Sequence, residues 1–379
     1  MLIFAEGFDD FTTAADVLLS AASAVPIFED GLTLESGRGG NGKALACRHY
    51  STADWTFPAC IVCIAGFAMT ATEPDPLNEG AAVTLYAGAV KVFQIRQINP
   101  ATLLLVDSAG AQIGTAPTRN FAGYIEVKAD TATGHLTVRA DGATVFDEAA
   151  NLGAAPVDHI GIESRSAVLL FDDLYIADAT GPRNNDFFGD TRVISDPPTG
   201  DGAEQQATPS TPGPHFGLVS EVPVDRDASY VAATAAAQTD TYTFAPIPAT
   251  LTIRAVNLVA YARSESGGAT AVAAVTRIAG VDHAAAPQPL PAVYRAIASN
   301  FEVNPATGQP WTAAEVNAAE FGFGVDVPGP GTGSGAMASI SPAADTRRVP
   351  VALTAYINAS DTPKVATVIA ALPMNWATN

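Results

Sequence analysis

Short apolar runs bounded by turn residues recur through the first half of this chain and constrain its fold more than any other feature. The runs are rich in β-branched and aromatic residues, as strands joined by tight turns should be. They are Val83–Tyr86, Val90–Ile95, Leu103–Asp107, Tyr124–Lys128 and His135–Arg139. Helical periodicity in this half is confined to Ala14–Ser23. The spacing therefore predicts an all-β sandwich or barrel.

Two connections between these runs predict hairpins. The segments Asp107–Gly110 and Ala140–Ala143 each contain a Gly, which tolerates the positive φ that tight loops require. Strands that follow one another in the sequence should therefore pair in an antiparallel manner.

The length and a change of composition divide the chain. A chain of 379 residues exceeds what one hydrophobic core usually organises, so we expect two domains. Stretches rich in Pro and Gly lie between residues 181 and 215 and favour an extended connector. Inside it, Phe187, Phe188 and Val193 should pack on a domain. The expected order is a lectin-type β-sandwich (1–181), a connector (182–215), a second, smaller β-rich domain (216–327) and a Gly-rich linker with a docking segment (328–379).

The second half also carries β signals. Leu251–Arg263 alternates apolar and polar residues over a long run, and Gly267–Gly268 predicts the turn after it. Thr312 and Glu315 have the spacing of a helix capping box. The apolar tail beyond the Gly-rich linker should dock either on its own domain or on a neighbouring subunit.

The charge excludes several classes of partner. The chain carries 39 acidic and 19 basic residues, a formal charge of −20. Binding to nucleic acid or to an anionic membrane requires clustered Lys and Arg, and the sequence has no such run. Membrane insertion is not expected, because no apolar stretch reaches the roughly 18 residues of a spanning helix. Met1–Phe8 lacks the features of a signal peptide, so we expect synthesis in the cytoplasm.

Three cysteines raise the question of a metal site. Cys60 and Cys63 have C-x-x-C spacing, and only Cys47 and His49 are near enough to complete a zinc site. The apolar run around Cys63 favours buried cysteines of the core instead. We assign no metal to them.

A search for catalytic groups finds no complete set. Sandwich glucanases place their carboxylates on one strand as E-x-D-x-x-E, and retaining enzymes need the two about 5.5 Å apart. Glu73-Pro74-Asp75 comes nearest, but Asn78 stands at the last position. Asp172 and Asp173 are adjacent, so strand alternation predicts opposite faces for them. We assign no catalytic, cofactor-binding or metal residue and expect a protein that is not an enzyme.

Calcium is the one cofactor that stays open. Asp9–Asp10 and Asp172–Asp173 could supply oxygen ligands if their strands are neighbours. The other interpretation is that these are surface carboxylates at a sheet edge.

Several segments in this order resemble a known family. They are Gly7–Phe11, Ile160–Ser164, Phe171–Gly181, Asn184–Val193 and Asn304–Asn317. Together they are similar to the concanavalin A-like (laminin G-type) lectin/glucanase sandwich of tailed-bacteriophage virion proteins, over residues 1–325. In that fold the first and last strands lie side by side, which suits the two F-D-D segments.

The resemblance implies a non-enzymatic structural component of a phage particle, located in the virion on the tail, tail tip or head surface. Its expected partners are other virion proteins, further copies of itself and a host-surface glycan. A stand-alone carbohydrate-binding module and a glycan hydrolase are the alternatives. Trp55 and Tyr86 are the aromatic residues that could contact a saccharide, although core packing is the commoner role of both.

Overall fold

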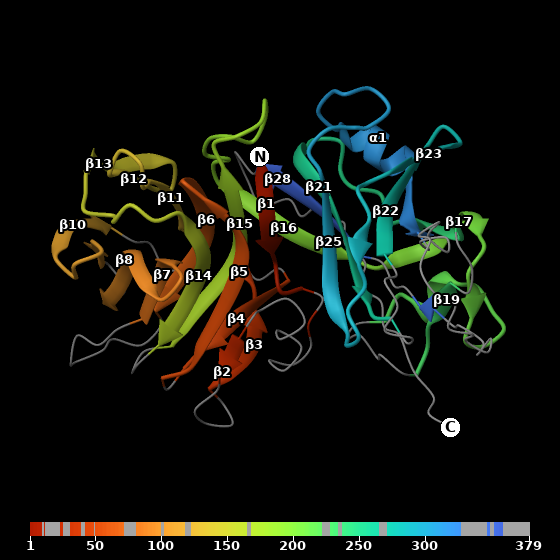
Figure 1. Ribbon diagram of the computed structural model, residues 1–379, viewed down its shortest axis with the longest axis horizontal. Coiled ribbons are helices and arrows are strands. Elements are labelled where there is room, and N and C mark those ends of the chain that lie inside the picture. The colour runs from red at the N-terminus through yellow and green to blue at the C-terminus, as the bar shows by residue number, and fades with distance from the viewer. Residues whose placement is uncertain are drawn as a thin grey trace, which may run out of the picture. The chain divides into compact units, whose positions relative to one another are not determined.

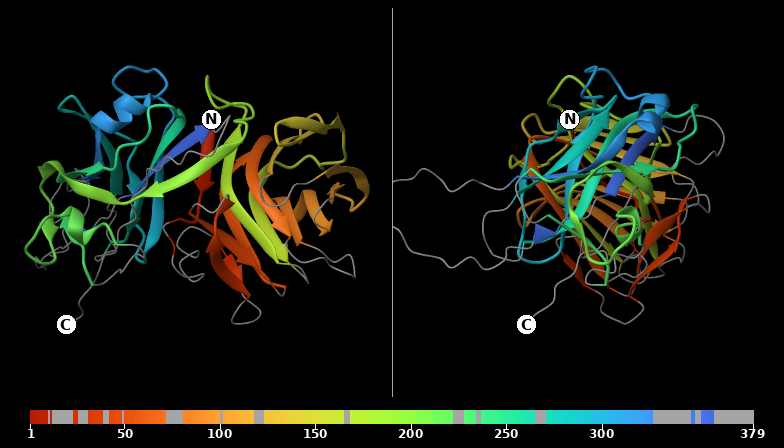
Figure 2. Two further views of the ribbon diagram at one scale, coloured as in Figure 1. Left: turned by 180° about the vertical axis from the view of Figure 1, so that it is seen from behind. Right: turned by 90° about the vertical axis from the view of Figure 1, so that its right-hand side faces the viewer.

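A computed structural model shows a protein built almost entirely of strands, and the all-β class expected from the sequence is confirmed. The chain divides into two compact units: unit 1 (residues 1–194, 251–255 and 356–366) and unit 2 (195–250, 256–355 and 367–379). Each unit is shown in Figures 1 and 2. The structure describes residues 1–9, 11, 23–25, 31–38, 42–48, 50–71, 81–99, 102–117, 123–164, 168–221, 228–233, 237–264, 271–326, 347–348 and 352–358.

Two antiparallel sheets form unit 1 (Figure 1). The eight-stranded sheet has the order β13 (Ala143–Ala149), β12 (His135–Ala140), β11 (Tyr124–Asp130), β6 (Val62–Ala71), β15 (Leu169–Asp178), β4 (Lys43–Cys47) and β3 (Leu32–Ser36), with β1 (Leu2–Glu6) also paired to β15. The seven-stranded sheet has the order β10 (Gln112–Pro117), β9 (Thr102–Val106), β8 (Val90–Asn99), β7 (Ala81–Ala87), β14 (Val157–Ser164), β5 (Thr52–Cys60) and β2 (Ser23–Val25).

Both predicted hairpins and the pairing of the first strand with the last are confirmed. Gly110 and Asp141–Gly142 have positive φ between their paired strands. β1 pairs with β15 from Leu2↔Ala177 to Glu6↔Leu174. The two ends of the sandwich sequence are therefore joined by backbone hydrogen bonds.

An aromatic cluster fills the space between the two sheets. Trp55 of the seven-stranded sheet stacks on Phe171 of the eight-stranded sheet with ring centroids 6.1 Å apart. Phe8 and Phe67 pack on Phe171 at 6.2 and 5.3 Å. All four side chains are buried. Trp55 is thus a core residue and is not available to a saccharide.

The three cysteines are also core residues, as predicted. Cys47, Cys60 and Cys63 are buried and carry free thiols. Burial raises the pKa of Cys47 to about 12, which keeps this thiol protonated and unreactive.

β15 contains the main irregularity of the sandwich. Its register with β6 shifts between Asp172 and Tyr175, and Asp173 has a φ of 53°. The prediction that Asp172 and Asp173 lie on opposite faces is wrong, because this bulge interrupts the alternation. Both are buried and both contact Arg38. Asp172 Oδ2 accepts the Arg38 backbone N–H at 2.8 Å, and Asp173 Oδ2 lies 2.9 Å from Arg38 Nε.

The other two carboxylate oxygens of this pair also have donors. Asp172 Oδ1 accepts the Asp173 N–H at 2.8 Å, and Asp173 Oδ1 accepts the Val193 N–H at 2.9 Å. Burial raises the pKa of both carboxyls; repulsion from Asp173 adds to this at Asp172, whereas the Arg38 guanidinium opposes it at Asp173. Arg38 reaches Asp190 as well, at 2.5 Å. One arginine therefore joins the bulge to the segment that follows the sandwich.

That segment packs on the eight-stranded sheet, as Phe188 and Val193 were expected to do. The Phe188 ring stacks on Tyr175 with centroids 4.2 Å apart, and both Phe188 and Val193 are buried. The Tyr175 hydroxyl donates to Glu126 at 2.6 Å. Gly66 makes room for this ring, because a Cβ there would lie 2.0 Å from Tyr175.

Residues 182–215 differ from the extended connector that their composition predicts. They contain β16 (Thr191–Asp196), β17 (Pro198–Gln205) and β18 (Thr208–Pro209). β17 is an edge strand with Pro at its first position, and its register with β20 shifts twice. Edge positions and bulges tolerate Pro and Gly, which explains why the composition misled.

The remaining elements lie wholly or mostly in unit 2. One sheet has the order β17, β20 (Thr239–Phe244), β26 (Glu320–Asp326), β22 (Ala271–Ile278) and β23 (Val281–Ala284), with β24 (Gln288–Pro289) paired to β22. β21 (Thr252–Ala262) pairs with β25 (Arg295–Phe301), and β19 (Val231–Ala233) lies between β18 and β27 (Arg347–Arg348). The other elements are η3 (Phe216–Leu218), α1 (Ala313–Ala318) and β28 (Ala352–Asn358).

The capping box predicted for the helix is confirmed. The Thr312 side chain accepts the Glu315 N–H at 3.2 Å, and the Glu315 carboxylate accepts the Thr312 N–H at 2.8 Å. The blue coil in Figures 1 and 2 is this helix. It is six residues long, and among the described residues no helix is long and apolar enough to cross a membrane.

A buried carboxylate organises the start of unit 2. Asp240 is fully buried and accepts the N–H groups of Gln206 and Ala207, both at 2.7 Å. His215 Nδ1 lies 2.6 Å from its other oxygen. These bonds hold the chain between β17 and η3 against β20.

Some predicted features fall outside the described residues. They are the helix at Ala14–Ser23 except for its last residue, which begins β2, the Gly267–Gly268 turn, the Glu73–Asn78 segment and the linker at 328–335. Of the tail, the structure describes Arg347–Arg348 and Ala352–Asn358, all in strands.

Arg38→Met tests the importance of the buried arginine. It leaves Asp172 and Asp173 buried without their cation, so the free energy of unfolding should fall by roughly 3–5 kcal/mol. Arg48→Met is the matched control, since Arg48 pairs with Glu35 at the surface and should cost roughly 0–1 kcal/mol. Urea denaturation measures both, and equal losses would contradict the assignment.

Candidate functional site

The alternation of the seven-stranded sheet presents one polar face, which we call the outer face. On β5, Ala53 and Trp55 point into the core, so Thr52, Asp54 and Thr56 point outward. The same alternation holds along β7 and β14. On β8 a bulge at Val92 interrupts it between Lys91 and Gln94. The outer-face residues are Thr52, Asp54, Thr56, Ala82, Thr84, Tyr86, Lys91, Gln94, Arg96, His159, Gly161 and Glu163.

Strand register arranges these residues in three rows across β5, β14, β7 and β8, in that order. The first row is Thr52, Glu163, Ala82 and Arg96. The second row is Asp54, Gly161, Thr84 and Gln94. The third row is Thr56, His159, Tyr86 and Lys91. Side chains in one row or in neighbouring rows are close enough to interact.

Small residues occupy the centre of this arrangement. Gly161, Ala82 and Thr84 form a low floor, and longer side chains stand around it. A Cβ at Gly161 would lie 2.4 Å from Asp54 Oδ1 and 3.1 Å from the Tyr86 ring. The space above Gly161 is therefore taken by the Asp54 carboxyl and the edge of Tyr86.

An aromatic pair borders the floor on one side. The rings of Tyr86 and His159 stack with centroids 4.5 Å apart and an angle of 5° between their planes. His159 Nδ1 lies 2.9 Å from Asp158 Oδ1, and Asp158 accepts the Gly88 N–H. The imidazole is thus held by a stack and a hydrogen bond. Burial raises the pKa of the Tyr86 hydroxyl, which therefore stays protonated.

Two carboxyl groups face the same floor from neighbouring strands. Asp54 on β5 lies opposite Gly161 on β14, two residues before Glu163. Burial raises the pKa of Asp54; the charge of His159 opposes this and that of Glu163 adds to it. Burial thus favours the protonated form of the Asp54 carboxyl.

A pocket of about 260 Å³ opens on the other side of the floor. It is lined by Lys91, Gln94, Arg96 and Glu163. Gln94 Nε2 donates to Thr84 Oγ1 at 2.9 Å, so the amide is fixed in place. The pocket thus combines one carboxyl group, one amide and two cations, and the aromatic stack and Asp54 lie on the same face of the sheet.

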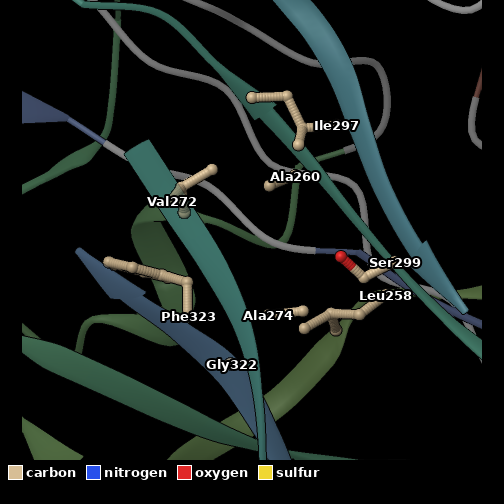
Figure 3. Close-up of a pocket in the computed structure, with 8 residues that line it drawn as sticks. All are labelled: Leu258, Ala260, Val272, Ala274, Ile297, Ser299, Gly322 and Phe323. Atoms are coloured by element: carbon tan, nitrogen blue, oxygen red, sulfur yellow. The ribbon is translucent and has the colours of Figure 1, made fainter. Parts of the chain in front are cut away.

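Unit 2 offers a cavity of a different kind (Figure 3). It lies between β21 and β25 on one side and β22 and β26 on the other, and Ser299 supplies the one side-chain oxygen that Figure 3 draws in its lining. Its volume of about 10 Å³ is about what one water molecule needs. This cavity is therefore a packing defect of an apolar core and not a ligand site.

The residues considered for calcium do not form a site of that kind in the described structure. Arg38 provides the positive charge beside Asp172 and Asp173, and Asp9 accepts the Lys43 N–H at 2.7 Å. Asp10 lies outside the described residues. Among those described, no group of three or more His, Cys, Asp or Glu side chains could hold a metal ion.

Of the two aromatic residues that the sequence put forward for saccharide contact, the structure places Tyr86 on the outer face and Trp55 in the core. The sequence did not identify Asp54, His159, Glu163, Lys91 and Arg96 as candidate site residues. Alternation along β5 and β14 could have shown that these residues point outward. The order of the strands, which brings β5, β14, β7 and β8 together, could not be obtained in that way.

No family model matches the chain, and no curated protein matches it. Solved structures match part of it. A sialidase shares 12% identity over 47% of this chain and 18% of its own length, with a TM-score of 0.35. The catalytic domain of a glycoside hydrolase family 131 protein from Coprinopsis cinerea shares 12% identity over 48% and 96% (TM-score 0.34). An alginate lyase of polysaccharide lyase family 7 shares 9% over 44% and 98% (TM-score 0.34).

These matches contradict the expectation that the chain is not an enzyme, since a hydrolase domain and a lyase are among them. At this identity the likeness concerns the fold alone and transfers no activity or residue. An E-x-D-x-x-E pattern has all its carboxylates on one strand, so it does not detect carboxyl groups such as Asp54 and Glu163 that come from two paired strands.

Asp54→Asn tests the electrostatics of the outer face. The unfolded chain loses this proton near the ordinary pKa of 3.8, whereas the folded protein keeps it to higher pH. The contribution of Asp54 to the free energy of unfolding is therefore greatest in acid and falls as the pH rises from 3.8 through the raised pKa. Relative to the wild type, Asp54→Asn should have a higher Tm at neutral pH and lose that advantage in acid, as melting curves between about pH 3 and pH 8 can show.

Asp130→Asn is the control of opposite sign. Although burial acts to raise it, hydrogen bonds from Thr133 and Ala132 lower the pKa of Asp130, so its replacement should reduce the Tm at neutral pH. A pH-independent difference for Asp54→Asn would contradict the assignment.

Proposed function

We propose that this chain binds glycans on the outer face of the seven-stranded sheet. The observation that carries the proposal is the pocket lined by Lys91, Gln94, Arg96 and Glu163 on the face that also bears the Tyr86–His159 stack. A sugar ring presents C–H faces that pack on an aromatic ring and hydroxyls that need convergent donors and acceptors. The outer face offers both within three neighbouring rows.

The rest of the proposal concerns where this face is displayed. We propose a structural component of a tailed-phage particle, assembled with further copies of itself and other virion proteins, whose outer face meets a host-surface glycan. The resemblance of residues 1–325 to phage virion proteins supports this. One of the segments that carry it, Asn184–Val193, belongs to the Arg38 network through Asp190 and Val193. Antibody labelling of purified particles tests the location.

Tyr86→Ala tests glycan binding. Loss of the ring removes the apolar surface under the sugar and the stack that holds His159, so affinity for any glycan the wild type binds should fall roughly tenfold or more. Tyr294→Ala is the matched control, a partly buried tyrosine of unit 2 that packs under Arg263. A glycan array followed by calorimetry provides the measurement. Equal affinity of both variants would refute the outer face as the site.

Hydrolysis at the same face is a second candidate, favoured by the Asp54–Glu163 pair. Asp54, with its raised pKa, can protonate the glycosidic oxygen, and Glu163 can act as the base or nucleophile that glycosidases require. Both side chains belong to the outer face of the sheet and stand in neighbouring rows.

Glu163→Gln tests this second candidate. If the pair is catalytic, release of reducing ends from a bound glycan should fall by about 100-fold or more, as when an acid–base group is lost. Glu148→Gln changes an exposed carboxylate of β13 and should leave the rate unchanged. A wild-type chain that binds a glycan without releasing reducing ends would exclude hydrolysis and leave the binding proposal intact.

A further inference from the structure

The cations of the outer face stand out against the composition of the chain. The formal charge is −20, and only four residues are lysines. Two of the three described lysines have partners in the protein: Lys128 pairs with Asp186 at 3.1 Å, and Lys43 donates to the Phe11 carbonyl. Lys91 has no ion-pair partner among the described residues, and it lines the outer-face pocket.

Strand geometry directs this lysine and Arg96 toward the same hollow. Lys91, Gln94 and Arg96 belong to one strand, β8, and stand in the third, second and first rows of the outer face. Gln94, held by Thr84, lies between the two cations. Long side chains from the outer rows can therefore meet a ligand group above Gln94.

The lining carries a net positive charge although the protein as a whole repels anions. Its charged members are Lys91, Arg96 and Glu163, two cations and one anion. Lys91 is partly buried in this pocket, so it loses part of its hydration, and an anionic ligand would supply the opposite charge that compensates for this loss. A neutral sugar would need no such charge.

We propose that the glycan bound on the outer face is acidic, and that Lys91 and Arg96 receive the carboxylate of one of its sugars. This inference rests on the proposed function. The planar guanidinium of Arg96 can donate two parallel hydrogen bonds to a carboxylate, and the Lys91 ammonium adds a point charge. The pocket volume of about 260 Å³ lies just below the usual range for small-ligand pockets, so it suits one sugar unit of a longer chain.

The test uses matched glycans and the full chain. The panel contains oligogalacturonate, oligomannuronate and oligoglucuronate, each beside its carboxyl-reduced neutral form, together with a sulfated oligosaccharide of similar length. Binding is measured by calorimetry at low and high salt. At least one uronate should bind about tenfold or more tighter than its reduced form, and added salt should weaken this preference because it screens the ion pairs.

Variants assign the effect to the pocket. Lys91→Gln should reduce the preference for the carboxylated glycan over its reduced form by about tenfold. Lys128→Gln is the matched control, a lysine of β11 in the other sheet, and should leave this preference unchanged. An unchanged preference in Lys91→Gln would overturn the inference.

The remaining outcomes separate this inference from the proposed function. Equal binding of carboxylated and reduced glycans, both lost in Tyr86→Ala, overturns the acidic ligand and keeps the glycan site. Tighter binding of the sulfated oligosaccharide than of every uronate would overturn the inference that the pocket receives a carboxylate. Binding of no glycan, on this panel or on the array, overturns the proposed function and the inference with it.

Discussion

The sandwich depends on the contact between two buried carboxylates, Asp172 and Asp173, and the side chain and backbone of Arg38. Asp172 and Asp173 lie in the bulge of β15, away from water, and Arg38 meets both of them. Removing carboxylates from water costs several kcal/mol for each ion unless a cation and hydrogen bonds replace the solvent. Here all four carboxylate oxygens have a donor or a cation. Arg38, which follows β3, is joined in this way to β15, the last strand of the sandwich, and to the segment after it.

This junction also decides which face of the sandwich is available to a ligand. The segment that Arg38 and Asp173 hold places Phe188 and Val193 over the eight-stranded sheet, where they pack around Tyr175. That sheet thus has apolar packing on both sides. The seven-stranded sheet has its aromatic core on one side and polar rows on the other. The packed face belongs to the eight-stranded sheet and the polar face to the seven-stranded sheet. A ligand site is therefore expected on β5, β14, β7 and β8.

Local patterns succeeded where neighbouring residues decide the structure. The alternation of apolar residues predicted strands, the Asp141–Gly142 turn predicted a hairpin, and Thr312 with Glu315 predicted a capped helix. Alternation failed at Asp172–Asp173, because a bulge with a positive φ at Asp173 turns both side chains toward Arg38. The Pro- and Gly-rich composition failed at β17, because an edge strand needs only one row of backbone hydrogen bonds.

The sequence by itself determined the all-β class, the pairing of the first strand with the last through the F-D-D resemblance, and the burial of the cysteines. Each of these follows from residue type, from the alternation of apolar and polar residues, or from a motif that can be read in the sequence. The tertiary structure alone decided that Asp54, Glu163, Tyr86, His159 and Lys91 share one face. Their separation in the sequence exceeds 100 residues between Asp54 and His159, and only the order and register of the paired strands bring them together. Register is set by the packing of a whole sheet against its core, which no local pattern specifies.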